Sequence, residues 1–159
     1  MSMAELERFL DIVAHLGSEA DFVGPRDERL IAAAEGRLGV TFPPSYRRFL
    51  LELGAGEFAG QEFFGVIDAA FSHPSVPNGV WLTLRARDDW LLPRSMLVVG
   101  FDGGVDYYVI DTANAMPDHE PAVEIWRPGV SLPEDRREQA ASDFGAFALR
   151  FAMQGLGAA

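Results

Sequence analysis

A pair of prolines at positions 43 and 44 limits most strongly what this chain can form, because it precedes an amphipathic segment. Proline has φ fixed near the helical value and lacks an N–H group, so it suits the first turn of a helix and no later position. The apolar residues that follow recur at three- and four-residue spacing and share one helix face: Tyr46, Phe49, Leu50 and Leu53. Gly54 can adopt the positive φ that ends a helix. We therefore predict a helix between the prolines and Gly54.

The rest of the chain alternates between helix and strand patterns. Apolar spacing predicts helices over residues 4–16, over 25–38 and from Ser142 onward. Strands are expected over 63–67, 96–101, 105–111 and 122–126, and the glycines at 103 and 104 suit a hairpin turn. The segment 78–90 fits either a helix capped by Asn78 or an edge strand. These elements predict an α+β single domain with an antiparallel or mixed sheet of about five to six strands, with helices packed mainly on one face.

The composition removes several kinds of site. A length of 159 residues is typical of one domain, here 1–159, with a core large enough to need no disulfide. The absence of cysteine excludes disulfides, thiolate nucleophiles and cysteine-based zinc sites. The three histidines, His15, His73 and His119, lack the spacing of metal ligands on a helix. We therefore expect neither a metal nor a cofactor.

The charge balance constrains the partner. The chain carries 13 basic and 24 acidic residues, a net charge of −11, and every basic residue is arginine. Such a chain repels phosphate, so we expect no nucleic-acid partner and no membrane association, and the charge favours a basic protein partner. The first residues lack the basic start and apolar run of a signal peptide, and no later stretch is apolar enough to span a membrane. A cytoplasmic location is expected.

The sequence gives little support for catalysis. The glycines at 54, 56 and 60 follow a helix and precede a strand, whereas a phosphate-binding loop follows a strand and opens a helix. No Gly-x-Ser-x-Gly motif is present. We therefore expect no enzyme and no catalytic residue. A carboxylate pair that comes together only in the fold stays open as an alternative.

Several short motifs occur in the order typical of one known family. The first runs through the Pro-Pro helix and is carried by Leu38, Gly39, Phe42, Pro43, Tyr46, Phe49, Leu50 and Gly54. Leu92-Pro93, the stretch 96–112 with its GGVDYYVIDT end, EPAVEIW at 120–126 and SDFGAF at 142–147 follow in that order. Together they resemble the SUKH superfamily of Smi/Knr-like domains over roughly residues 25–150. Val105 stands where many members have glycine, so the turn before it departs from the family pattern.

The resemblance implies a function. Bacterial members of the superfamily are understood mostly as immunity proteins, which bind and neutralise polymorphic toxins, often nucleases or deaminases, encoded nearby. An acidic chain fits this role because a nuclease must present a basic surface to its substrate. A regulatory scaffold, as the fungal members suggest for cell-wall synthesis, is the alternative reading, and a small-ligand binder or enzyme is the third. A monomer or weak dimer is expected.

The candidate partner-binding residues are acids and a tyrosine. Period-two alternation over 105–111 places Asp106 and Tyr108 on one face of the sheet, and Tyr107 and Asp111 on the other. One tyrosine must therefore point away from the helices. We expect the open sheet face to bind the partner, with Tyr108 as its aromatic anchor. The residues predicted for this surface are Glu57, Glu62, Asp106, Tyr108 and Asp111.

Overall fold

The computed structural model describes residues 2–74, 78–132 and 136–157. Within these ranges the helices are α1 (Ser2–His15), α2 (Glu28–Leu38), α3 (Pro44–Glu52), α4 (Gly79–Trp90) and α5 (Phe144–Gly155), with short 3-10 turns η1 (Gly17–Glu19) and η2 (Thr112–Asn114). The strands are β1 (Ala20–Phe22), β2 (Gly56–Phe58), β3 (Gln61–Phe63), β4 (Met96–Phe101), β5 (Tyr107–Asp111), β6 (Val123–Trp126) and β7 (Gln139–Ala141).

The strands form one antiparallel sheet in which spatial order follows chain order from β1 to β7. This confirms the predicted α+β class. The described sheet has seven strands, slightly more than expected, because β1 and β7 are three residues long and too short to give a periodic pattern. The expected strand 63–67 is in fact β3, which ends at Phe63, preceded by its hairpin partner β2.

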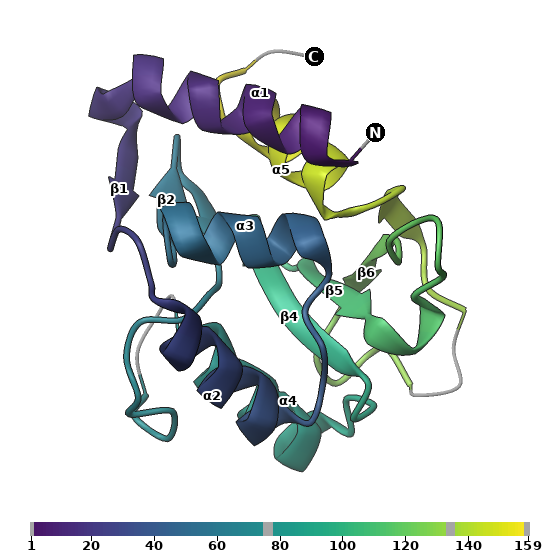
Figure 1. Cartoon of the computed structure of the whole chain (residues 1–159). Coiled ribbons are helices and arrows are strands. Elements are labelled where there is room, and N and C mark those ends of the chain that lie inside the picture. The colour runs from purple at the N-terminus through teal and green to yellow at the C-terminus, as the bar shows by residue number, and fades with distance from the viewer. Residues whose placement is uncertain (1, 75–77, 133–135, 158–159) are drawn as a thin grey trace.

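Most helices cover one face of the sheet. The helices α1, α3 and α5 lie together on that face (Figure 1), and α2 contributes apolar residues to the same core. Phenylalanine rings fill the interface, with Phe49 of α3 within 5.8 Å of Phe63 and 5.5 Å of Phe144 between ring centroids. We call this the helix-side core. It shows that Phe49 lies mid-core, as the spacing after the prolines predicts.

Helix α4 packs on the opposite face through Ala86, while Val80 at its start reaches the helix-side core. Along β4 and β5, Leu97 and Ile110 belong to the helix-side core, whereas Val98 and Val109 belong to a smaller core beneath α4. Since successive strand residues point to opposite faces, the two cores lie on either side of the sheet. The α4-side core consists of Phe64, Ala86, Leu92, Met96, Val98, Val109 and Trp126.

Capping residues decide where two of the helices begin. The side chain of Asn78 accepts a hydrogen bond from the Trp81 N–H at 3.1 Å, so segment 78–90 is the capped helix and not the edge strand. Asp27 caps α2 in the same way, through the Leu30 N–H at 2.8 Å. The expected start of α2 at residue 25 is therefore wrong by three residues, because the cap lies after Pro25.

The first and last helices pack against each other. Helices α1 and α5 lie side by side (Figure 1), and α1 starts at Ser2 where the sequence predicts residue 4. Gly145 at the start of α5 lies so close to Ser2 that a Cβ there would collide with the Ser2 carbonyl oxygen. The two ends of the chain are therefore joined by a contact that only glycine permits. None of the described helices has the length and apolar character needed to cross a membrane.

Candidate functional site

A row of side chains crosses the sheet from β1 to β6. The antiparallel register places each member directly opposite the next one on the neighbouring strand. We call this set the cross-sheet row, and its members in order are Asp21, Glu57, Glu62, Phe101, Tyr107 and Trp126. Directly opposite residues have side chains on the same face, with Cβ atoms about 4.5–5.5 Å apart. The row thus brings three carboxylates and three aromatic rings onto one surface.

The neighbours of the row show which face it occupies. Phe58 and Phe63, which follow Glu57 and Glu62 in sequence, lie in the helix-side core. The two glutamates therefore point away from α1, α3 and α5. At the other end of the row, Trp126 lies in the α4-side core. The row accordingly runs from solvent towards the edge of the region that α4 covers.

Solvent exposure falls steadily along the row. Asp21 and Glu57 are exposed, whereas Glu62, Phe101 and Tyr107 are half-buried. Trp126 is buried, with 3% of its surface exposed. At the exposed end of the row, a Cβ on Gly56 would collide with the Asp21 carbonyl oxygen, so glycine is needed at this position of β2. The carboxylates are therefore held by backbone pairing and still face solvent.

Among the residues that the structure describes, none neutralises the three carboxylates. Among the described residues, neither Asp21 nor Glu57 nor Glu62 accepts a side-chain hydrogen bond or joins an ion pair. Partial burial raises the pKa of Glu62, and the charge of Glu57 opposite raises it further. Like charges directly opposite each other in a sheet are destabilising. The exposed end of the row is thus a concentrated negative charge that pairs with no cation in the described ranges.

The aromatic half of the row is a continuous stack. The Phe101 and Tyr107 rings stack with centroids 4.4 Å apart, and Trp126 meets Tyr107 edge-on at 6.0 Å. Phe64 supports Tyr107 from beneath at 6.2 Å. Burial raises the pKa of the Tyr107 hydroxyl, and the charge of Glu62 adds to this effect. A rigid, half-exposed aromatic surface beside carboxylates suits contact with basic side chains, which combine charge with an apolar stem.

Two of the predicted site residues lie together as expected. Glu57 and Glu62 face each other across the β2–β3 pair, on the face away from the three helices. Whether they bind a partner stays a prediction.

The expected position of Tyr108 on the open face is wrong. Its ring packs against both Phe147 and Phe151 of α5, with centroids 4.9 and 5.1 Å away, and only 9% of its surface is exposed. Tyr108 lies opposite Gly100, whose missing side chain leaves room for the Phe147 ring. Alternation correctly separates the two tyrosines but does not say which face carries the helices, and Tyr107 is the one that points away from them.

The two remaining predicted acids lie outside the row. Asp106 precedes β5 and forms an ion pair with Arg127 at 2.7 Å. Asp111 lies at the far end of β5, where it accepts hydrogen bonds from the Ser95 hydroxyl at 2.7 Å and the Ala113 N–H at 3.1 Å. Both carboxylates already have partners, so neither adds to the unpaired charge of the row.

Four members of the row were not predicted: Asp21, Phe101, Tyr107 and Trp126. Asp21 was missed because β1 is too short to show alternation. The aromatic members were missed because their relation to the acids depends on strand register, which sequence periodicity does not give. In the described parts of the chain, no group of three or more acidic or histidine side chains is arranged to hold a metal ion.

Comparison with known proteins adds one finding. A family model described as SMI1-KNR4 cell-wall matches residues 28–147. The match covers most of the chain and runs from the first residue of α2 into α5, so it includes every strand of the sheet except β1. No curated protein matches the chain.

Proposed function

Because the chain belongs to the SMI1-KNR4 family of the SUKH superfamily, we propose that it is a cytoplasmic immunity protein that binds and neutralises a basic toxin domain. The toxin is a nuclease or nucleic-acid deaminase encoded nearby, and the immunity protein acts without catalysis, as a monomer or weak dimer. The observation that best supports this proposal is the unpaired carboxylates of the cross-sheet row beside its aromatic stack. We propose the row as the binding surface, in place of the surface around Tyr108 that the sequence predicts.

The energetics of the row favour a cationic partner. In the free protein, Glu57 repels Glu62 across the strand pair and partial burial disfavours the Glu62 charge. Basic side chains of a partner would relieve this repulsion, and the negative field would speed the encounter. The row is therefore less favourable in the free protein than in a complex with a basic surface.

The aromatic end of the row would supply contact area. Tyr107 is half-buried and held between the Phe101 and Trp126 rings, so little side-chain freedom is lost when a partner covers it. Central aromatic residues of this kind often dominate interface energies. Tyr107 takes the anchor role that the sequence analysis gives to Tyr108.

Neutralisation follows from the chemistry of the toxin. An enzyme that acts on nucleic acid must offer a cationic surface to phosphates. A row of carboxylates docked on that surface would compete directly with the substrate. A regulatory scaffold of the Smi/Knr type is the second candidate, because the matching family is described by its relation to the cell wall.

The decisive experiment is a pull-down with the product of the neighbouring gene, followed by association kinetics at low and physiological salt. We expect association to slow by about tenfold or more as the Debye length shortens to about 8 Å, with a smaller change in dissociation. Glu62→Gln should slow association, whereas Asp11→Asn, a matched loss of charge on the exposed surface of α1, should not.

A second variant tests the aromatic anchor. We expect Tyr107→Ala to weaken binding by about 2 kcal/mol or more, with circular dichroism used to verify that the variant is folded. A salt-independent association rate, or failure to bind any toxin candidate encoded nearby, would favour the regulatory scaffold.

A further inference from the structure

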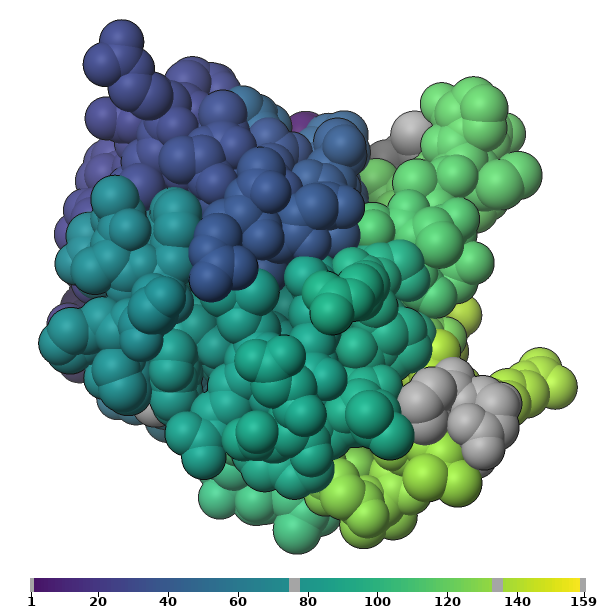
Figure 2. Space-filling model, turned by 90° about the horizontal axis from the view of Figure 1, so that it is seen from below, coloured from purple at the N-terminus to yellow at the C-terminus, as the bar shows by residue number. Residues whose placement is uncertain are grey.

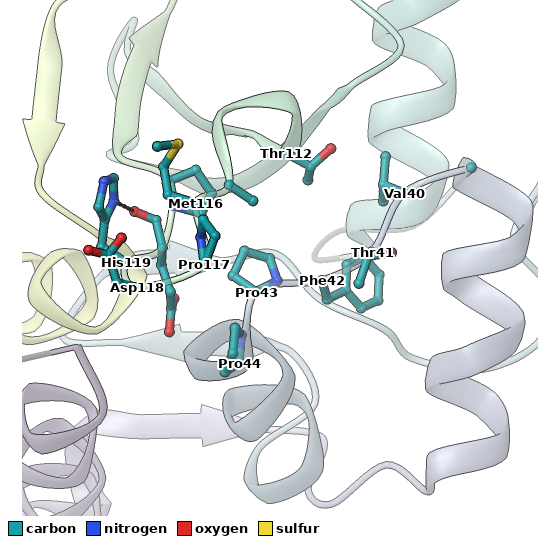
Figure 3. Close-up of a pocket in the computed structure, with 14 residues that line it drawn as sticks. Val40, Thr41, Phe42, Pro43, Pro44, Thr112, Met116, Pro117, Asp118 and His119 are labelled. Atoms are coloured by element: carbon teal, nitrogen blue, oxygen red, sulfur yellow. Dashed lines mark hydrogen bonds between the residues drawn. The ribbon is translucent and has the colours of Figure 1, made fainter.

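A second surface feature is built from residues outside the cross-sheet row. It is a pocket of about 550 Å³ between the α2–α3 connection and the segment from η2 to β6. Seen from below, the green lobe after β5 stands out from the body beside the blue α2–α3 segment (Figure 2). Figure 3 shows Val40, Phe42 and Pro43 on one side of the pocket, with Met116 and Pro117 on the other.

The walls of this pocket are fixed in place. The carboxylate of Glu120 accepts hydrogen bonds from the Ser45 hydroxyl at 2.6 Å and from the Ser45 N–H at 3.1 Å, in the first turn of α3. This contact, which we call the Glu120 clamp, joins the two walls across 75 positions of sequence. Prolines at 43, 44, 117 and 121 restrict the backbone on both sides. The pocket is therefore preorganised, which lowers the entropy lost on binding.

The chemistry of the pocket selects the charge of its occupant. Asp118 and Glu120 line it, and none of its described lining residues is arginine. The Asp118 side chain is exposed and has no hydrogen bond or ion pair among the described residues. An anionic ligand would be repelled, and a cation would find a carboxylate with its oxygens free.

The apolar side of the pocket selects the shape of the occupant. Met116 is 55% exposed although its side chain is apolar, and it lies beside Pro117 on the wall opposite Val40 and Phe42 (Figure 3). The more accessible Val40, Pro44 and Pro117 continue the apolar surface, with Phe42 and Pro43 buried behind it. A long basic side chain matches this arrangement because its methylene stem is apolar and its end is charged.

We propose that this pocket is a second docking site, which takes an arginine side chain from an extended segment of a protein partner. Its volume lies in the range of sites for ligands of a few residues' size. Arginine fits better than lysine, because a planar guanidinium can bind one carboxylate through two donors while packing on an apolar surface. The inference does not depend on the toxin proposal, since a peptide alone can test it.

The test uses the full-length protein and a blocked tripeptide, acetyl-Ala-Arg-Ala-amide, with the glutamate and norleucine tripeptides as controls. Binding is followed by NMR of methyl-labelled methionine, with the Met116 signal assigned through Met116→Leu. We expect the arginine peptide to shift the Met116 signal with a dissociation constant of about 1 mM or tighter, and the two control peptides to bind at least about tenfold more weakly.

Two variants locate the site. Ala115→Trp, which places a large ring in an exposed lining position, should weaken binding at least tenfold, whereas Ala113→Trp, exposed on the same loop but outside the pocket, should not. Asp118→Asn should weaken binding of the arginine peptide and leave the norleucine peptide unaffected. The proposal is overturned if the arginine peptide fails to shift Met116, if the glutamate peptide binds equally well, or if Ala115→Trp has no effect. None of these outcomes bears on binding at the cross-sheet row.

Discussion

Removing the charge of Glu62 should make the free protein more stable. Glu62 is half-buried on β3, lies directly opposite Glu57 and has no cationic partner among the described residues. Glu62→Gln keeps the size and shape of the side chain and removes both the repulsion and the cost of partly burying a charge. Most substitutions destabilise a protein, so a gain in stability is a specific expectation.

The size of the gain follows from the geometry. Cross-strand pairs change stability by about 0.2–1 kcal/mol, and like charges directly opposite each other act unfavourably within that range. Solvent screening at the exposed Glu57 keeps the repulsion between the two carboxylates small. The partial burial of the Glu62 charge adds a second unfavourable contribution to stability. We expect Glu62→Gln to raise the free energy of unfolding by about 0.5–1 kcal/mol, which is roughly 1–4 °C in melting temperature for a domain of this size.

The gain should depend on pH in a defined direction. The pKa of Glu62 is raised in the folded state, first by burial and then by Glu57. The folded protein therefore binds this proton more tightly than the unfolded chain. Protonation of Glu62 therefore stabilises the folded protein. This stabilisation is complete below the pKa of Glu62 in the unfolded chain, near 4.5, and is lost as the pH rises through the pKa of Glu62 in the folded protein. The advantage of glutamine should accordingly be full at neutral pH and shrink towards zero in acid.

Urea denaturation of both proteins, at neutral pH and just below pH 4.5, measures this difference. Asp11→Asn is the matched control, with no expected gain. The double variant with Glu57→Gln should gain less than the sum of the single variants, because each change removes the same repulsion. A lower midpoint for Glu62→Gln at neutral pH, or an equal gain at both pH values, would refute the like-charge account of the row.

Three further predictions concern other parts of the fold. Phe49→Ala should lower the free energy of unfolding by about 3–5 kcal/mol in urea denaturation, because the Phe49 side chain is fully buried among aromatic rings, and a loss below about 1 kcal/mol would contradict this. Glu120→Gln should lower the free energy of unfolding by about 1–2 kcal/mol, because it weakens the Glu120 clamp. Asp118→Asn should leave the free energy of unfolding nearly unchanged, and equal losses in the two variants would show that the clamp does not stabilise the protein. In an absorbance titration, the three tyrosines should ionise above pH 10 while the protein is folded, because burial raises the pKa of Tyr108 to about 12 and also raises those of Tyr46 and Tyr107. Because the folded protein disfavours ionised tyrosine, the raised pKa values contribute stability that is present below pH 10 and is lost as the pH rises through the pKa values of the folded protein. Ionisation near pH 10 in the folded protein would contradict the burial of the tyrosines.

Much of the fold can be predicted because its signals are local. Pro44 begins α3, Gly39 ends α2 with φ of +71°, and Asn78 caps α4, each through the backbone property that the residue type supplies. Such signals depend on a residue and its neighbours within one turn. They predict the existence of helices well and their exact ends less well, as Asp27 shows for α2.

The candidate site could be predicted only in part because it depends on strand register. Glu57 and Glu62 are separated by a tight connection, so their pairing follows from one hairpin. Phe101 and Tyr107 join them only through the pairing of β3 with β4 and β4 with β5. The choice between Tyr107 and Tyr108 depends on which face α5 covers, and α5 lies more than 30 residues further along the chain.

The contact between α1 and α5 affects how the protein can fold during its synthesis. The apolar face of α1, formed by Leu6, Phe9 and Val13, is buried in the finished structure, and its neighbour α5 comes after every other described helix in the chain. At about 5–20 residues per second, the ribosome needs on the order of ten seconds to add the intervening chain. Throughout that interval this face has no α5 to pack on. During synthesis, Phe9 can pack early on Phe49 of α3 and Phe63 of β3, but the part of the face that contacts α5 stays exposed until α5 has been made.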